Sequence, residues 1–409
     1  MKGAVLAVGD ELLLGDIVNS NAAWLGQQLA AVGVHVVHSA MVGDDVAQLS
    51  TALRRAVEDA DIVVVTGGLG PTIDDLTREA IALVAGAPLQ RQPGIEVELR
   101  AKFAAYGFPM QPAVLAQADV PRGAEALDNP VGTAPGLWLE LADGTVLLAL
   151  PGPPHEMRAV VEAVLPRLAE RSGTRVVTRT LRCSGLGESA VAELVQGAVV
   201  VPDGVALAYL AGGAVVRVRF TTSGDPALLE PLVEACAVAL GDAVWGYDEQ
   251  SQDGVVHDLL AARGETVAVA ESLTGGLLSA ALSQRPGSSA TFRGGLVPYA
   301  TDLKGALAGV APEVLAEHGA VAPPTAAALA TGARDRLGAT WGLGVTGVAG
   351  PDEQEGKAVG TVHLAVAGPD GVEVSTVRLP GDRDRVRLLT VTTALDLLRR
   401  RLSPGKSGG

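Results

Sequence analysis

Short runs of apolar residues alternate along the chain with longer stretches in which apolar residues recur every three or four positions. Residues 3–9 (GAVLAVG) predict a buried strand, and the stretch that begins at Asn19 or Ser20 places Leu25, Leu29 and Val32 on one helical face. The alternation continues through VHVVHSAMVG, VAQLSTALRRAVEDA and DIVVVTGG. Strands that alternate with helices are typical of a parallel, doubly wound α/β sheet.

A hairpin and a long helix complete this first domain, which we expect to cover residues 1–172. GLWLEL and TVLLALPG flank Ala142-Asp143-Gly144, a hairpin turn. The following stretch, PGPPHEMRAVVEAVLPRL, repeats apolar residues at helical spacing. A break at ERSGTR then separates the first domain from a small α+β module (173–246). A second break, at WGYDEQSQDG, separates this module from a second α/β domain (254–402).

Composition narrows the class of protein. The 409 residues are 48% hydrophobic, which is enough to form several cores. The net charge of −15 argues against direct nucleic-acid binding. Cys183 and Cys236 are too few for a disulfide framework. No apolar run reaches about 18 residues, which predicts no membrane span. Early acidic residues also argue against a signal peptide, so we expect a cytoplasmic protein.

Three loops in the first domain directly follow predicted strands: GDELLLGD (9–16), TGGLGPTIDD (66–75) and PGPPHEM (151–157). Ligands bind at the carboxyl ends of strands in such sheets, and glycines let the backbone approach an anion. A helix expected to begin at Pro71 or Thr72 would aim its N–H groups at the loop. A plain strand-to-helix turn would look similar, but three such loops favour a binding site.

Two adjacent carboxylates, Asp74 and Asp75, follow the glycine loop and are our candidate ligands for a divalent metal. Asp10 and Glu11 are competing candidates.

Four stretches of the last domain carry candidate chemistry: AESLTGG (270–276), PGSSATF (286–292), VPYATDLK (297–304) and GVTGVAGP (344–351). A serine beside a buried lysine can attack an amide, because burial lowers the lysine pKa. We expect Tyr299 to end a strand and Thr301 to cap the helix that contains Lys304. Serine and threonine are also ordinary turn formers, and the local sequence alone favours that interpretation.

The first domain resembles the molybdopterin-binding-like fold through TGGLGPTIDDLT. Together with GDELLLGDIVNSN and PGPPHEM it is similar to the CinA (competence/damage-inducible) family over essentially the whole chain. The resemblance implies hydrolysis of ADP-ribose to AMP and ribose phosphate with Mg²⁺, Mn²⁺ or Co²⁺, and K⁺ as a further cation. It implies substrate contacts in this domain at Gly9, Glu11, Asn21, Gly67, Gly68, Gly70 and Thr72.

The last domain resembles the nicotinamide-nucleotide amidohydrolase domain of that family, through AES-x-TGG, GSS, Y-x4-K and G-x-GP. This implies deamidation of nicotinamide mononucleotide without a cofactor. Ser289 matches the nucleophile, and Tyr299 and Lys304 match the groups that handle its proton. Matching pocket residues are Ser272, Thr274, Gly275, Gly276, Thr346 and Arg383, with Arg387 as an alternative to Arg383. The chain departs from the family at YAT and at PDEQEGKAVGTV.

The middle module resembles the KH-like spacer of the family but lacks the G-x-x-G loop of nucleic-acid-binding KH domains. We therefore expect a spacer or a dimerisation element in a homodimer. Two alternatives remain open: a binder of a molybdopterin-like ligand without hydrolysis, and an interaction protein in DNA uptake or recombination.

Overall fold

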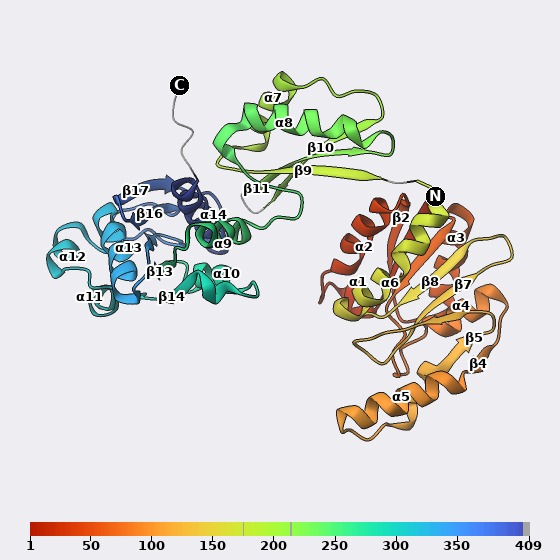
Figure 1. The fold of residues 1–409 in the computed structure, drawn as a ribbon. Helices are drawn as coiled ribbons and strands as arrows, with labels where there is room; N and C mark the ends of the chain where they lie inside the picture. Colours follow the sequence, from red (N-terminus) through yellow and green to blue (C-terminus); the bar gives the residue numbers. More distant parts are fainter. Residues whose placement is uncertain (175, 213–214, 404–409) are drawn as a thin grey trace. The chain divides into compact units, whose positions relative to one another are not determined.

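The structure, a computed structural model, describes residues 1–174, 176–212 and 215–403 (Figure 1). The chain forms two compact units, Met1–Val177 and Thr178–Gly409. None of the helices within the described ranges combines the length and the apolar character needed to cross a bilayer.

The N-terminal unit is built on a six-stranded sheet in the order β2-β1-β3-β8-β7-β6. Strands β2, β1, β3 and β8 run parallel, whereas β8–β7 and β7–β6 pair antiparallel, which confirms the predicted hairpin. The central strands are buried from end to end, as expected for a sheet covered on both faces. The strands are β1 (Lys2–Val8), β2 (His35–Val42), β3 (Ile62–Thr66), β6 (Glu125–Leu127), β7 (Gly136–Glu140) and β8 (Val146–Leu150).

Helices cover both faces of this sheet, which confirms the doubly wound prediction. On one face, Leu25 of α2 (Ser20–Ala31) and Met157 of α6 (Pro154–Ser172) share a core with Val64. On the other face, α3 (Val46–Asp59) and α4 (Thr77–Ala85) pack against the opposite side of the same strands. The remaining elements are α1 (Asp10–Leu14), β4 (Leu89–Arg91), α5 (Pro93–Tyr106), η1 (Pro112–Ala118) and β5 (Asp119–Pro121).

The second unit begins with a four-stranded sheet in the order β10-β11-β9-β12. Both cysteines are free and buried in this module, and burial raises the pKa of the Cys183 thiol to about 12, as for an unreactive packing residue. Its elements are β9 (Val177–Ser184), α7 (Glu188–Ala198), β10 (Val205–Gly212), β11 (Val215–Thr222), η2 (Pro226–Leu228), α8 (Leu229–Leu240), η3 (Gly241–Ala243) and β12 (Val244–Tyr247).

The last part of the chain forms a five-stranded sheet in the order β14-β13-β15-β16-β17. The strands β14, β13 and β15 are parallel, and β16 and β17 add to the sheet antiparallel. Helices α9, α10 and α14 share one core with this sheet, and α11 and α13 share another with β13. The strands are β13 (Val267–Glu271), β14 (Phe292–Leu296), β15 (Trp341–Gly347), β16 (Thr361–Gly368) and β17 (Gly371–Arg378). The helices are α9 (Gln252–Arg263), α10 (Leu277–Ser283), η4 (Ser288–Ala290), α11 (Thr301–Ala308), α12 (Pro312–His318), α13 (Pro323–Leu337) and α14 (Arg383–Leu402).

Three local predictions about element ends are wrong. Helix α4 begins at Thr77, not at Pro71 or Thr72, because the Asp75 carboxylate binds the N–H groups of Gly70 and Thr72 and holds this segment as a loop. Strand β14 ends at Leu296, so Tyr299 lies in the loop beyond it. Thr301 is the first residue of α11, and the residue before it occupies the N-cap position without a side-chain hydrogen bond.

Candidate functional sites

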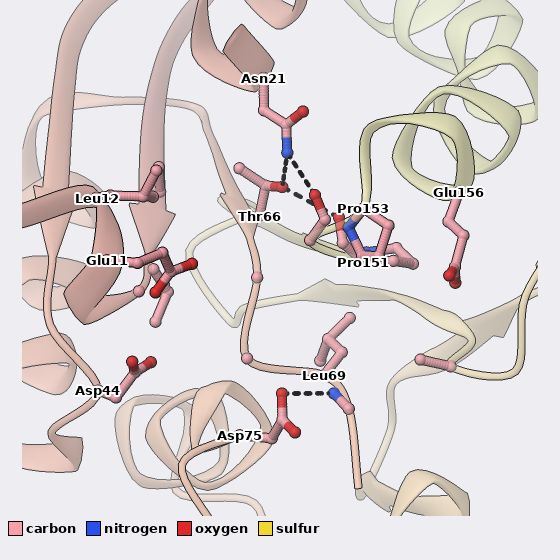
Figure 2. A pocket seen from close by; sticks show the side chains of 18 of the residues that line it. Glu11, Leu12, Asn21, Asp44, Thr66, Leu69, Asp75, Pro151, Pro153 and Glu156 are labelled. Atoms are coloured by element: carbon pink, nitrogen blue, oxygen red, sulfur yellow. Dashed lines mark hydrogen bonds between the residues drawn. The ribbon is translucent and has the colours of Figure 1, made fainter. Parts of the chain in front are cut away.

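The N-terminal unit has a cavity of about 550 Å³ where β1, β3 and β8 end (Figure 2). Loops after all three strands line it, as the three glycine-containing stretches predicted. Nine residues expected there from the sequence lie in its wall: Gly9, Glu11, Asn21, Gly67, Gly68, Gly70, Thr72, Asp74 and Asp75.

Two glycines of the loop after β3 leave no room for a side chain. Gly67 has φ +102°, and a Cβ there would lie 2.4 Å from the carbonyl oxygen of Val8. Gly68 has φ +67°, and a Cβ there would lie 2.4 Å from the hydroxyl of Thr77. Positive φ and close neighbours both require glycine, so the backbone itself forms this part of the cavity wall.

Arg78 supports the same loop through hydrogen bonds to its carbonyl groups. Its guanidinium donates hydrogen bonds of 2.5 Å to the Leu69 carbonyl and 2.9 Å to the Gly70 carbonyl. Burial lowers the pKa of Arg78. The two carbonyl groups are thereby bound within the protein, and the loop has a fixed course.

The two predicted metal ligands differ in their surroundings. The Asp75 carboxylate accepts hydrogen bonds from the backbone N–H of Gly70 at 2.7 Å and of Thr72 at 2.8 Å, and from the Thr72 hydroxyl. It therefore closes the loop. Asp74 is exposed and lies in the cavity wall.

Of the competing candidates Asp10 and Glu11, Glu11 lies in the cavity wall. Asp10 instead pairs with Asp44: the Asp10 N–H donates to the Asp44 carboxylate at 2.9 Å, and the Asp44 N–H donates to the Asp10 carboxylate at 3.2 Å. Asp44 also lines the cavity, and burial, followed by the charges of Asp10, Glu11 and Asp74, raises its pKa.

The cavity is strongly acidic. Glu11, Asp44 and Asp75 lie along one side, and Glu156 lies across from them (Figure 2). Among the described residues in its wall there is no lysine, arginine or histidine. Within the described part of the chain, no three His, Cys, Asp or Glu side chains are arranged to hold a metal ion by themselves. A phosphate bound here would therefore need hydrogen bonds from backbone N–H groups and a cation that binds together with it.

Asn21 joins two of the loops. Its side-chain amide donates to the Thr66 hydroxyl at 3.1 Å, as Figure 2 shows, and to the Gly152 carbonyl at 2.7 Å. This side chain ties the end of β3 to the loop after β8.

The C-terminal sheet carries a second cavity, of about 270 Å³, at the carboxyl ends of β13 and β15. Five predicted residues line it: Ser272, Tyr299, Lys304, Thr346 and Arg383.

Lys304 is 1% exposed, which is rare for a lysine. Its Nζ lies 3.2 Å from the Ser272 hydroxyl, 3.0 Å from the Pro298 carbonyl and 3.2 Å from the Tyr299 carbonyl. Burial lowers the pKa of Lys304. Two carbonyl groups thus orient the amine, and its third partner is a serine hydroxyl.

The predicted pairing of Ser289 with Lys304 is wrong. Strands β13 and β14 are parallel, with Val267 opposite Phe292. Ser289 precedes β14, whereas Ser272 follows β13, so the two serines lie at opposite ends of the sheet. Ser289 is exposed and is not among the described residues that line the cavity.

Thr274, Gly275 and Gly276 also lie outside the wall that the described residues form around this cavity. The Glu271 carboxylate, fully buried, accepts the N–H groups of Gly276 at 3.0 Å and of Leu278 at 2.9 Å. A carboxylate of the protein therefore already occupies the start of α10, where an anion could otherwise bind. These residues shape the loop that carries Ser272 and do not contact the cavity.

The structure also distinguishes the two candidate arginines. Arg383 donates to the Tyr299 hydroxyl at 2.7 Å and to the Gly350 carbonyl at 2.6 Å, and it lines the cavity. Arg387 donates to the carbonyls of Leu273 at 3.2 Å and Thr274 at 3.0 Å, which makes it a support for the loop.

Known proteins resemble this chain along its length. A CinA-like protein from Frankia casuarinae is 50% identical over 422 residues, which cover 98% of this chain and 96% of that protein. The chain belongs to the CinA family. A CinA-like protein from Parasynechococcus marenigrum is 43% identical, covering 97% of both chains, and one from Prochlorococcus marinus is 42% identical, covering 98% and 96%.

Family models match three consecutive segments of this CinA-family chain. Residues 4–170 match "Probable molybdopterin binding domain", residues 178–246 match "Damage-inducible protein CinA KH domain", and residues 249–402 match "CinA C-terminal domain". The resemblance to the CinA family predicted from the motifs is thereby confirmed.

Sequence reasoning missed several residues of both CinA-family sites. Asp44 follows the second predicted strand in VGDD, so the rule that ligands gather at strand ends could have found it. Glu271 ends a buried apolar run, which marks a carboxylate that needs partners. Glu355 accepts the N–H groups of Ala320 and Val321 from a distant loop, and no sequence signal indicated this contact.

Proposed function

We propose that the C-terminal domain hydrolyses the carboxamide of nicotinamide mononucleotide to nicotinic acid mononucleotide and ammonia. The observation that carries this proposal is the buried Lys304 amine bonded to the Ser272 hydroxyl. A desolvated amine is a stronger candidate base at moderate pH than an ordinary lysine, because less of it is protonated. The substrate class comes from the resemblance of the motifs to the amidohydrolase domain of the family.

In the proposed reaction the Ser272 oxygen attacks the carboxamide carbon while its proton passes to the neutral Lys304 amine. A carbon–oxygen bond forms, the carbon–nitrogen bond breaks, and the proton leaves with the nitrogen as ammonia. Water then attacks the ester, the bond to Ser272 breaks, and one proton of the water restores the serine hydroxyl. Tyr299 accepts a hydrogen bond from Arg383, so its own O–H can donate to the departing nitrogen. No metal or cofactor enters these steps.

Ammonia release from nicotinamide mononucleotide tests this assignment. Ser272→Ala should abolish release, whereas the matched Ser289→Ala variant should retain the rate of the unaltered chain. The reverse result would restore Ser289 as the nucleophile and remove the role of Lys304 proposed here.

For the N-terminal domain we propose metal-dependent hydrolysis of ADP-ribose to AMP and ribose 5-phosphate. The acidic cavity supports this proposal, because a diphosphate could enter it only with divalent cations that offset both sets of charges. Glu11, Asp44 and Asp74 are the carboxylates that would hold Mg²⁺, Mn²⁺ or Co²⁺, jointly with substrate oxygens and water. The metal would polarise the diphosphate, and K⁺ is a further cation of the proposal.

A second candidate for this domain is the binding of a molybdopterin-like ligand without hydrolysis, which the match to the molybdopterin-binding family favours. Incubation with ADP-ribose and each metal separates the two, because a pure binder would release no AMP.

We further propose that the protein works on nucleotides in the cytoplasm as a homodimer and does not bind DNA directly. The net charge of −15 supports the last point. DNA retention that falls steeply with salt would instead favour the interaction protein in DNA uptake.

A further inference from the structure

Glu355 lies in the loop between β15 and β16, far in the sequence from the segment that it binds. Its two carboxylate oxygens accept hydrogen bonds from the backbone N–H groups of Ala320 and Val321, each at 3.0 Å. Its φ of +53° belongs to a region that residues other than glycine seldom adopt. A Cβ at Gly319 would lie 2.4 Å from the same carboxylate, so the fit at this contact is close.

The segment held by Glu355 is a wall of the Ser272 cavity. Ala320 and Val321 line the cavity and are almost fully buried. The carbonyl of Ala320 accepts a 2.7 Å hydrogen bond from the hydroxyl of Thr346. Glu355 and Thr346 therefore bind this backbone from two sides, and the loop before β16 is tied to it.

Glu355 is exposed and makes no ion pair with Lys304 among the described residues, but its negative charge bears on the titration of that amine. Burial lowers the pKa of Lys304, and the negative charges of Glu355 and then Asp302 oppose that effect. Asp302 lies on the same helix as Lys304, and Glu355 lies in the loop between β15 and β16. The other titratable groups in the cavity wall are Tyr299, Asp352 and Arg383.

From this geometry we infer that Glu355 is a positioning residue of the amidase site, which fixes the Ala320–Val321 wall and adds a negative charge to the electrostatic environment of the Lys304 ammonium. This inference rests on the proposed deamidase function. Glu355 belongs to the acidic loop PDEQEGK, where the chain departs from the family pattern. The inference assigns this residue of the loop a role in the reaction.

The test compares Glu355→Gln, Glu355→Asp and the matched control Glu353→Gln, which alters an exposed carboxylate of the same loop. Ammonia release from nicotinamide mononucleotide is measured from pH 6 to 10 with the full-length chain. Glu355→Gln removes a charge that favours the ammonium, so the acid limb of the rate profile should move to lower pH. Glu355→Asp keeps the charge but shortens the reach, so KM should rise while the limb stays. Glu353→Gln should change neither.

A second measurement needs no turnover. Acetylation of Lys304 by acetic anhydride, followed by mass spectrometry across the same pH range, reports the titration of the amine itself. Glu355→Gln should shift its midpoint to lower pH than in the unaltered chain and in Glu353→Gln. Coincident midpoints for all three would overturn the inference. Absence of ammonia release with a shifted midpoint would overturn the deamidase function and leave the effect of the Glu355 charge on Lys304 intact.

Discussion

The hydroxyl of Tyr299 accepts a 2.7 Å hydrogen bond from the guanidinium of Arg383, which joins the loop after β14 to the first residue of α14. Among the described residues of the cavity wall, Arg383 and Lys304 are the cationic side chains. A planar guanidinium suits a substrate phosphate, and Lys304 is committed to Ser272.

Arg383→Ala should therefore lower kcat/KM for nicotinamide mononucleotide by roughly 10- to 150-fold, the loss expected for one hydrogen bond to a charged group. The loss should be smaller for nicotinamide riboside, which lacks the phosphate. Arg385→Ala, two residues along the same helix and outside the described cavity wall, is the control. Equal losses on both substrates would show that Arg383 acts through Tyr299 alone and not on a phosphate.

The pH dependence of the deamidase follows from the buried amine. Lys304 must be neutral to accept the serine proton, so the rate should rise with pH through its lowered pKa. The midpoint of this rise should lie below about 10.4, the usual lysine value. Lys304→Arg should be inactive throughout, because a guanidinium stays protonated. Lys102→Arg, in the N-terminal unit, should behave as the unaltered chain. A rate that rises only near pH 10.4 would contradict the role of Lys304.

The sequence predicted the sheets and the grouping of strand-end loops well, because both follow from local patterns. Leu25 and Leu29 repeat at helical spacing, and the glycines of residues 67–70 mark a tight turn. The sequence alone could not show which serine lies beside Lys304. Ser272 and Ser289 stand in similar small-residue turns, and only the pairing of β13 with β14 decides which end of the sheet each one occupies.

The sequence also could not predict hydrogen bonds in which a side chain binds the backbone of another part of its loop. Helix α4 begins later than predicted, at Thr77. The Asp75 carboxylate accepts hydrogen bonds from the N–H groups of Gly70 and Thr72, which holds the residues between them in a loop. Local propensity favours a helix at Pro71, and the carboxylate overrides it.

The glycine loop of the N-terminal unit gives a stability prediction. Gly67→Ala forces a side chain into a positive φ and against the Val8 carbonyl, and should cost about 2–4 kcal/mol. Gly86→Ala also meets a positive φ, +61°, but with no atom within 4 Å, and should cost about 1 kcal/mol. Hydrogen exchange of the β3 amides measures both. Equal protection in the two variants would mean that the contact with Val8 is soft.

The last prediction separates the two aspartates after the glycine loop. Asp74→Ala should leave stability unchanged, because its carboxylate is exposed, but should raise the metal concentration needed for half-maximal AMP release from ADP-ribose. Asp75→Ala should destabilise the loop by about 1–3 kcal/mol, since the N–H groups of Gly70 and Thr72 lose a charged acceptor. EDTA should stop AMP release and spare ammonia release in both variants. If Asp74→Ala and the unaltered chain respond identically to Mg²⁺, Mn²⁺ and Co²⁺, then Asp74 does not hold the metal, and Glu11 and Asp44 are the carboxylates to alter next.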